Sequence, residues 1–317
     1  MKYLIVIISL ISTFSFTAQQ QLIDIYCSDD SCTHTVIDPE MLVVERWDIL
    51  AQSKFWKTVM NLSSDTCIVN IADTREILGY VEKDKWFDQD EEEKKSYKDS
   101  VIDYNCLDSN TKIYITSGKK EFYLIEEVIP SISKAITVFQ DNNVDPWYAQ
   151  SILLIESPAQ LNYSNAGAYG PFQLMKNVAR TMGLTVNSKL DERKDFDKSA
   201  YAASKLLKTI CIPQAYRILC EVGDIEPKGN ELWFKFLVLH IYHAGARNVE
   251  SLLSQQEEPL QGMDLIKWMW TNEYGNFKNA SQNYSQVAIA AMLTLQDIVL
   301  EDCDYIFQCN DNYSTDY

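Results

Sequence analysis

An apolar helix that ends on a carboxylic acid, followed by a glycine-containing turn, decides the fold of this chain: WYAQSILLIES at 147–157 and AGAYGPFQLM at 166–175. Asp145 and Pro146 are typical of a helix start. Glu156 therefore lies at the end of the helix, in an apolar setting that disfavours the charged form of a carboxyl group. A carboxylic acid that stays protonated near neutral pH can give a proton to a leaving group, so Glu156 is the first candidate catalytic residue.

Helical periodicity extends along most of the chain. The helices that apolar spacing and capping signals predict lie at 45–62, 73–80, 122–139 with a kink or break at Pro130, 147–156, 171–182, 197–209, 231–244 and 284–300. The segment 231–244 is apolar on most sides, which predicts a central position. One short strand is predicted at 112–116, and the charged segment 83–98 is interpreted as a solvated helix face or loop.

These patterns predict a mainly α chain with two domains. An all-α domain is expected at 122–302, preceded by a smaller mixed, mostly helical N-terminal domain at 19–121 and followed by a tail at 303–317. No sequence feature assigns a role to the N-terminal domain, and contact with other proteins of the same compartment is one interpretation of it.

The first 18 residues are typical of a secretory signal peptide. Lys2 is followed by an uncharged apolar run at 3–16 and a small residue at Ala18. The run is short for a membrane span, and no comparable run follows. We therefore expect an exported, periplasmic or secreted protein without a stable membrane anchor; the alternative is an uncleaved anchor.

Eight cysteines follow the signal, an even number that suggests disulfide bonds in an exported chain. The simplest pairing joins neighbours in sequence: Cys27/Cys32, Cys211/Cys220 and Cys303/Cys309, which leaves Cys67/Cys106. Many other pairings are formally available.

The formal net charge of −17 argues against nucleic acid as a partner, because binding to phosphates needs a basic face. It also argues against docking on an anionic membrane. A glycan substrate is compatible with this charge. The 18 Tyr and 7 Trp residues include enough aromatic faces for sugars, although most are expected to be core.

Four segments occur in a fixed order: Glu156-Ser157, GAYGPFQLM at 167–175, YHAG at 242–245 and YSQV at 284–287. This order resembles the transglycosylase domain of soluble lytic transglycosylases, glycoside hydrolase family 23, which is related to goose-type lysozyme. The resemblance covers about 140–300. It implies a lysozyme-like all-α fold and an enzyme that cleaves peptidoglycan between N-acetylmuramic acid and N-acetylglucosamine.

The resemblance also implies roles for individual residues. Glu156 matches the single acid/base, which protonates the glycosidic oxygen and then takes the proton of the muramoyl 6-hydroxyl as a 1,6-anhydro ring closes. No cofactor and no metal are implied. The residues that match or adjoin the family's glycan cleft are Ser164, Tyr169, Gln173, Met175, Tyr242, His243 and Tyr284.

The sequence departs from the family pattern at three places. The loop from Glu156 to the glycine turn is one residue shorter, Pro171-Phe172 replaces Leu-Met, and His243 stands where the family usually has Asn. His240 and His243 lie three residues apart on a helix, a spacing that would also suit a metal, but a core histidine is the simpler interpretation.

Two other functions stay open at this point. A hydrolase on the same fold would need a second carboxylate, for which Asp191 and Glu192 are the candidates in a charged loop. A protein that binds peptidoglycan strands without cleaving them would keep the cleft and lose the chemistry.

Overall fold

The computed structural model describes residues 22–26, 33–156, 163–164 and 166–310 of the chain. The predicted signal peptide lies outside the described residues. The same holds for Ser157, where the helix that carries Glu156 is predicted to end, and for the Cys27/Cys32 pair. Among the helices that are described, none is long and apolar enough to cross a membrane.

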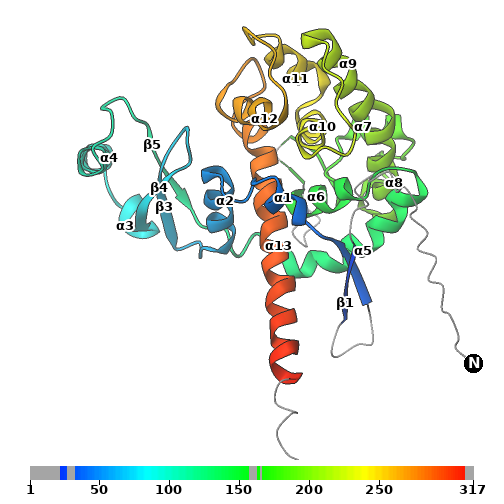
Figure 1. Cartoon of the computed structure of the whole chain (residues 1–317), viewed down its shortest axis with the longest axis horizontal. Helices are drawn as coiled ribbons and strands as arrows, with labels where there is room; N and C mark the ends of the chain where they lie inside the picture. Colours follow the sequence, from blue (N-terminus) through cyan, green and yellow to red (C-terminus); the bar gives the residue numbers. More distant parts are fainter. Residues whose placement is uncertain (1–21, 27–32, 157–162, 165, 311–317) are drawn as a thin grey trace, which may run out of the picture.

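Most of the described chain belongs to one helical body (Figure 1). Its α-helices are α5 Ile125–Asp141, α6 Trp147–Glu156, α7 Lys176–Met182, α8 Phe196–Leu206, α9 Ile212–Gly223, α10 Leu232–Ala244, α11 Ala246–Leu253, α12 Gly262–Thr271 and α13 Ala280–Asn310. A 3-10 turn, η1 (Glu192–Lys194), precedes α8, and a π-helical turn, η2 (Leu207–Cys211), joins α8 to α9. The prediction of a mainly α chain is confirmed.

Two apolar helices lie at the centre of this body. Every residue of α10 from Leu232 to Ile241 is buried, as is every residue of α6 from Trp147 to Leu154. Each helix is apolar all round, which is the pattern of a helix enclosed by others. The long helix α13 runs through the middle of the molecule in Figure 1 and contacts both α6 and α10. Glu156 is thus carried on a helix that its neighbours hold on every side.

The N-terminal segment packs into the same core. It contains the hairpin β1 Leu22–Tyr26 and β2 Thr33–Ile37, then α1 Glu40–Val44 and α2 Ala51–Asn61. The buried Gln150 side chain on α6 accepts from the Ile37 N–H and donates to the Ile37 carbonyl, each at 2.8 Å. Trp56 on α2 donates through Nε1 to Gln286 Oε1 on α13 at 3.1 Å. Residues 33–62 therefore share their core with the helices, while the division of the chain at residue 121 stays a prediction.

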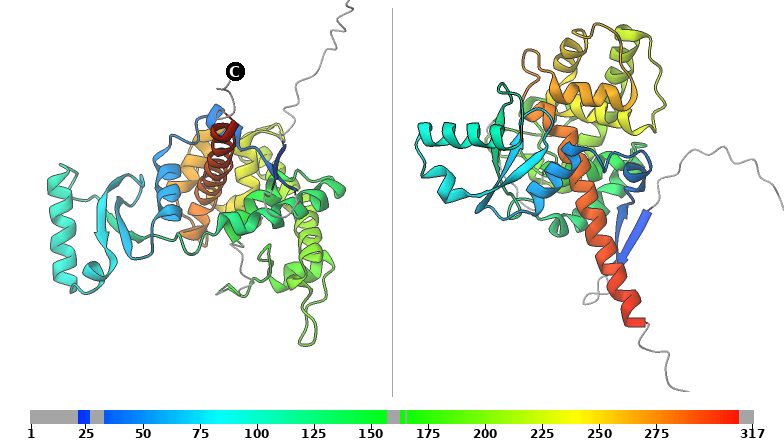
Figure 2. Two further views of the ribbon diagram at one scale, coloured as in Figure 1. Left: turned by 90° about the horizontal axis from the view of Figure 1, so that it is seen from below. Right: turned by 60° about the vertical axis from the view of Figure 1, so that its left-hand side comes forward.

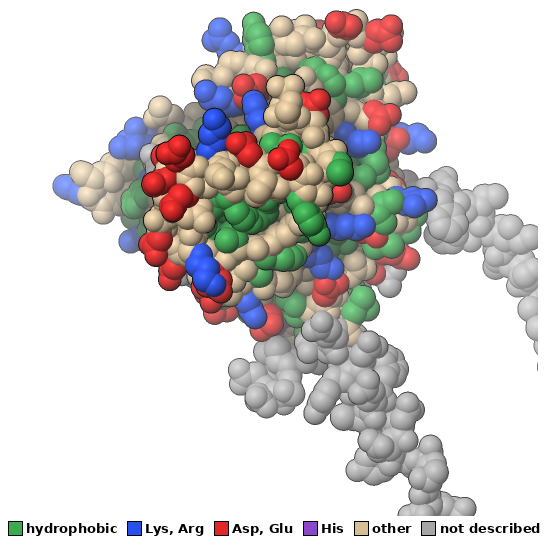
Figure 3. Space-filling model, turned by 90° about the vertical axis from the view of Figure 1, so that its left-hand side faces the viewer, with side chains coloured by type: hydrophobic (Ala, Val, Ile, Leu, Met, Phe, Trp, Pro, Cys, Tyr) green, Lys and Arg blue, Asp and Glu red, His purple; other side chains and the backbone are tan. Residues whose placement is uncertain are grey.

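A small lobe projects from this body (Figure 2, left). Its antiparallel sheet has the order β4-β3-β5, from β3 Thr66–Ile71, β4 Ile77–Glu82 and β5 Ile113–Ser117. The helices α3 Lys83–Phe87 and α4 Glu91–Tyr104 complete it. No residue of α4 is buried, and acidic side chains gather along one edge of this side of the molecule in Figure 3. The strand predicted at 112–116 is confirmed, and the charged segment is a solvated helix as expected.

Several predicted helices need correction. The helix predicted at 73–80 is wrong: Ile77 begins strand β4, and Arg75, with φ of 63°, turns the chain into it. Pairing with β3 outweighs the capping signal at Asp73, because alternate residues of β4 form ladder hydrogen bonds with β3 and the side chains pack across the strands. The helix predicted from residue 171 begins only at 176, since the turn 171–175 precedes it.

Three other helices differ in extent. The segment 45–62 contains α2 from Ala51, preceded by a turn, and α5 runs through Pro130 as a single helix without a break. The last helix is longer than the predicted 284–300 and continues into the segment expected to be the tail. The helices α11 and α12 were not predicted, because each is short and follows closely on a stronger helical pattern.

The Cys211/Cys220 and Cys67/Cys106 disulfides are also wrong, because these four thiols are free. Cys211 and Cys220 lie on one continuous helical run, and nine residues of helix rise about 13 Å. A disulfide needs Cα atoms closer than about 7 Å. The side chains of Cys303 and Cys309 lie outside the described part of the structure.

This arrangement predicts how the thiols react. Cys106 and Cys220 are exposed, whereas Cys67 and Cys211 are buried, and burial raises the pKa of Cys211 to about 12. With Ellman's reagent at pH 8, Cys106→Ser and Cys220→Ser should each remove one fast-reacting thiol from the native protein. The control Cys211→Ser should remove none until denaturant is added. A count of fast-reacting thiols that stays unchanged in Cys220→Ser would instead indicate that Cys220 is bonded in the wild type.

Candidate functional site

Glu156 is the last residue of α6 and the most strongly perturbed carboxyl group of the site. Asp145 fixes the other end of α6 by accepting from the Trp147 N–H at 2.9 Å, and Lys235 pairs with Asp145 at 2.7 Å. Burial of the Glu156 carboxyl group raises its pKa from 4.5 to about 7, although an interaction with the Tyr284 hydroxyl lowers it in part. Near neutral pH the group is therefore divided between the acid and the carboxylate, which lets it both give and accept a proton.

Three tyrosines lie within range of the charge of this carboxyl group. The charge of Glu156 and burial together raise the pKa of Tyr123, Tyr242 and Tyr284, burial being the larger cause in each case. All three phenols are therefore neutral hydroxyl groups near the acid. Tyr284 Oη is buried and has no hydrogen-bond partner within normal distance among the described residues. Its effect on the pKa of Glu156 shows that it still lies close to that carboxyl group.

Two histidines lie behind Tyr284. The His243 ring stacks on the Tyr284 ring with centroids 4.4 Å apart and 23° between the planes. Burial lowers the pKa of His243 to about 4, so the ring is neutral at physiological pH. His240 is fully buried, and its Nε2 lies 2.8 Å from Ser285 Oγ, which also accepts from Trp270 Nε1. The two imidazoles thus have structural neighbours, and no group of three metal-ligating side chains occurs in the described part of the chain.

The glycine turn is a compact loop between residues 164 and 175. Ser164 Oγ accepts from the Ala168 N–H at 2.9 Å, and Tyr169 pairs with Leu174 through two backbone hydrogen bonds. Gly170 has a φ of 84°, and a Cβ there would lie 1.9 Å from the Arg193 carbonyl oxygen. Only glycine fits this position, because both the backbone angle and the close contact exclude a side chain.

The turn presents Gln173 and is tied to the helices near Glu156. Gln173 has a φ of 44°, and its Nε2 donates to the Gly170 carbonyl at 3.1 Å. The Tyr242 hydroxyl donates to the carbonyl of Phe172 at 2.6 Å. Since Tyr242 also senses the Glu156 charge, this bond connects the turn to the carboxyl site. Met175 follows at the start of α7 and is exposed.

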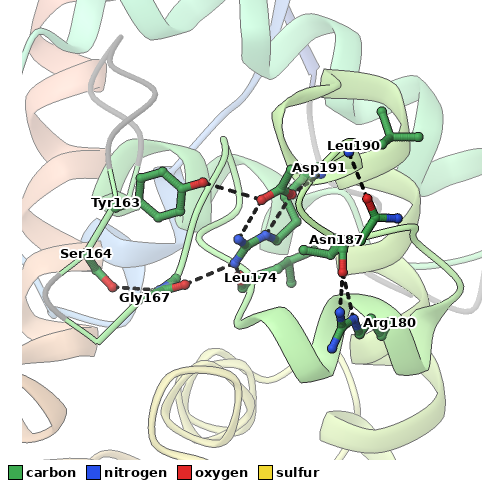
Figure 4. A network of polar contacts seen from close by, with 11 residues as sticks. Tyr163, Ser164, Gly167, Leu174, Arg180, Asn187, Leu190 and Asp191 are labelled. Carbon is green, nitrogen blue, oxygen red and sulfur yellow. Dashed lines mark hydrogen bonds and ion pairs between the residues drawn. The ribbon is translucent and has the colours of Figure 1, made fainter.

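Arg193 binds the turn through hydrogen bonds that belong to the polar network around Gly167, Leu174 and Asp191 (Figure 4). Its side chain is buried and pairs with Asp191 through Nε–Oδ1 at 3.0 Å and Nη2–Oδ2 at 2.7 Å. The same guanidinium donates through Nη1 to the carbonyls of Gly167 at 3.0 Å and Leu174 at 2.9 Å. Arg193 lowers the pKa of Asp191 by hydrogen bonding. These bonds join both ends of the turn to one cation.

The structure thus brings the predicted residues into two connected groups. Tyr242, His243 and Tyr284 lie with Glu156, while Ser164, Tyr169, Gln173 and Met175 belong to the turn. Sequence reasoning missed Tyr123, which precedes α5 outside every motif, and Arg193, which stands within a run of charged residues, DERKD at 191–195. Neither carries a sequence signal of its own. In the sequence, a buried arginine within a charged run looks like a solvated one, and a tyrosine of the site looks like a tyrosine of the core.

Comparison with protein families identifies this region. Residues 135–261 match the family model "Transglycosylase SLT domain", so this part of the chain carries a domain of that family with a lysozyme-like, all-α fold. The domain indicates a lytic-transglycosylase-type function related to peptidoglycan, a material that lies outside the cytoplasm. The match spans less than half of the chain and includes Glu156 and the glycine turn, but not Tyr123 or Tyr284. No curated protein matches the chain significantly.

Proposed function

We propose that this protein is a peptidoglycan lytic transglycosylase that cleaves the β-1,4 bond between N-acetylmuramic acid and N-acetylglucosamine. The observation that carries the proposal is the Glu156 carboxyl group, whose pKa burial raises to about 7 and whose charge reaches three neutral tyrosines, within the residues that match a transglycosylase domain. Export from the cytoplasm and a soluble state in the cell envelope are part of the same proposal.

In this mechanism Glu156 acts alone. The protonated carboxyl group gives its proton to the glycosidic oxygen as the bond from that oxygen to C1 of the muramoyl residue breaks. The muramoyl 6-oxygen then bonds to C1 and passes its proton to the Glu156 carboxylate, which restores the acid. The product is a 1,6-anhydro ring, and no water is consumed.

The tyrosines suit both halves of this cycle. A neutral hydroxyl can donate to the carboxylate that forms after the first proton transfer, and Tyr284 lies close enough to Glu156 to lower the pKa of that carboxyl group. A hydroxyl oxygen can also stabilise the positive charge that develops at the sugar ring in the transition state.

Both candidates for the second carboxylate of a hydrolase are bound by other groups. Asp191 is bound by Arg193, and Glu192 pairs with Lys198 at 2.5 Å and accepts from the Thr185 N–H at 2.6 Å. These partners lower the pKa of both acids. Each is therefore fixed as a structural anion, which favours the mechanism in which the substrate supplies the attacking oxygen.

Product analysis separates the candidate reactions. We expect purified sacculi digested with the full mature chain to yield muropeptides with 1,6-anhydro ends, lighter by one water than reducing ends in mass spectrometry. Reducing ends would indicate a lysozyme-like hydrolase. Binding to sacculi without any product would indicate a peptidoglycan-binding protein and would overturn both enzymatic mechanisms.

Tyr284→Phe should shift the pH profile of this reaction. The Tyr284 hydroxyl lowers the pKa of Glu156, so its loss should raise that pKa and move the alkaline limb of kcat/KM to higher pH. Rate measurements between pH 5 and 9 would test this, with Tyr201→Phe on α8 as the control because Tyr201 is exposed there. An alkaline limb that stays in place, or moves to lower pH, would contradict the role given to this hydroxyl.

A further inference from the structure

We propose that Tyr163 and Tyr169 form an aromatic platform that binds a pyranose ring of a glycan strand beside the cleavage site. The proposal rests on the proposed function for the identity of the glycan. It adds a residue, Tyr163, that neither the family motifs nor the domain match assigns to a role.

The two rings form a parallel stack. Their centroids are 4.1 Å apart, and the angle between the ring planes is 14°. Tyr163 is 63% exposed, so one ring has its inner face on Tyr169 and much of its remaining surface in solvent. The stack therefore presents a flat aromatic ring, backed by a second ring, at the protein exterior, and such a ring can pack against the apolar face of a ligand.

The stack is held in place by buried charge. The Arg193 guanidinium carbon lies 5.8 Å from the Tyr163 centroid and 5.4 Å from the Tyr169 centroid, within range of cation–π attraction to both rings. The Tyr163 hydroxyl is also directed toward Asp191, with Oη and Oδ2 3.5 Å apart (Figure 4). Because Arg193 is itself fixed by Asp191 and two carbonyls, the platform is set before any ligand binds.

The position of the platform connects it with the carboxyl site. Tyr169 pairs through its backbone with Leu174, so its ring stands at the end of the loop that carries Gln173. The same loop is bonded through the Phe172 carbonyl to Tyr242, which senses the charge of Glu156. A sugar ring bound on Tyr163 would therefore belong to the same glycan strand as the bond to be cleaved and would lie near that bond.

The chemistry of the platform selects a neutral sugar face. A pyranose ring with equatorial substituents presents axial C–H groups on one face, and these pack on the negative face of an aromatic ring. β-1,4-linked N-acetylglucosamine units have this arrangement. Such stacking needs no positive charge, which suits a chain with a formal net charge of −17.

Calorimetric titration with chitotetraose, in a Glu156→Gln background that prevents turnover, would test the platform. Tyr163→Ala should weaken binding about 10-fold, the loss expected for one aromatic stacking partner. Tyr163→Phe keeps the ring face and should bind within about 2-fold of the parent. Tyr201→Ala is the matched control, because it removes another exposed tyrosine, 45% exposed on α8.

Three results would overturn the platform: no measurable binding by the parent, unchanged affinity in Tyr163→Ala, or an equal loss in Tyr163→Phe, which would assign the effect to the hydroxyl and Asp191. These outcomes are separable from failure of the proposed function. Anhydro products from wild type with unchanged affinity in Tyr163→Ala would overturn only the platform. Affinity that depends on Tyr163 in a chain that yields no product would overturn only the enzymatic function.

Discussion

Glu156→Gln should reduce the release of anhydro-muropeptides by about 1,000-fold, within the range that general acid–base catalysis contributes. The amide keeps the shape of the side chain and its place near Tyr284, but it can neither give a proton to the glycosidic oxygen nor take one from the 6-hydroxyl. Because no second acid shares this role in the proposed mechanism, no residue replaces the lost proton transfer. Rates on purified sacculi, compared with Glu126→Gln on the exposed side of α5, measure the effect.

Glu156→Gln should also raise the stability of the folded protein relative to wild type above neutral pH, although it lowers activity. The folded pKa of Glu156, about 7, lies above its ordinary value of 4.5, so the native state holds a proton that the unfolded chain releases. Stability due to this group therefore falls as pH rises from 4.5 to 7, by roughly 3 kcal/mol in total. Glu156→Gln should remove that decline. A variant that keeps substantial activity, or unfolds like wild type at pH 8, would contradict the assignment.

Arg193→Ala should lower the free energy of unfolding by about 3–5 kcal/mol, as when one partner of a buried ion pair is removed. The substitution removes the cation that pairs with Asp191 and the side-chain donor of the Gly167 and Leu174 carbonyls, and it leaves Leu174 with only the backbone bond from Tyr169. Arg193→Lys should recover little of this loss, since an ammonium group cannot reproduce the paired bonds to the carboxylate.

Denaturant unfolding would measure this effect, with Lys194→Ala as the control because Lys194 is the exposed neighbour of Arg193. Lys194→Ala should change stability by less than about 0.5 kcal/mol. A loss of less than about 1 kcal/mol in Arg193→Ala would show that the turn keeps its shape without the guanidinium.

Much of the helical body could be predicted because its apolar patterns are strong. The helix with Glu156 and the central helix α10 are apolar all round, and flanking signals mark their ends: Asp145-Pro146 before the first, Gly245 after the second. The small sheet was harder. Asp73 and Gly79 look like helix caps, and only pairing with β3, a partner that local sequence does not specify, makes this segment a strand.

The residues of the candidate site also fall into those that the sequence predicts and those that it does not. Glu156, Gln173 and Tyr284 could be found because they stand in motifs with a fixed order along the chain. Arg193 could not, since its role depends on two carbonyls, of Gly167 and Leu174, that come from a separate loop. The cysteines show the reverse error: an even count in an exported chain suggested pairs, but helical geometry separates Cys211 from Cys220.

The hydrogen bonds between Ile37 and Gln150 bear on where this protein could be cut. Gln150 is 1% exposed, and both polar atoms of its amide are satisfied by a residue more than a hundred positions earlier. A fragment trimmed to the boundaries of the recognised domain would bury that amide without partners, at a cost of about 1–3 kcal/mol. It would also lack α13 and so expose the apolar surface of α6 and α10 that α13 now covers. The smallest part of this protein that folds on its own is therefore larger than residues 135–261, the segment that matches the family model.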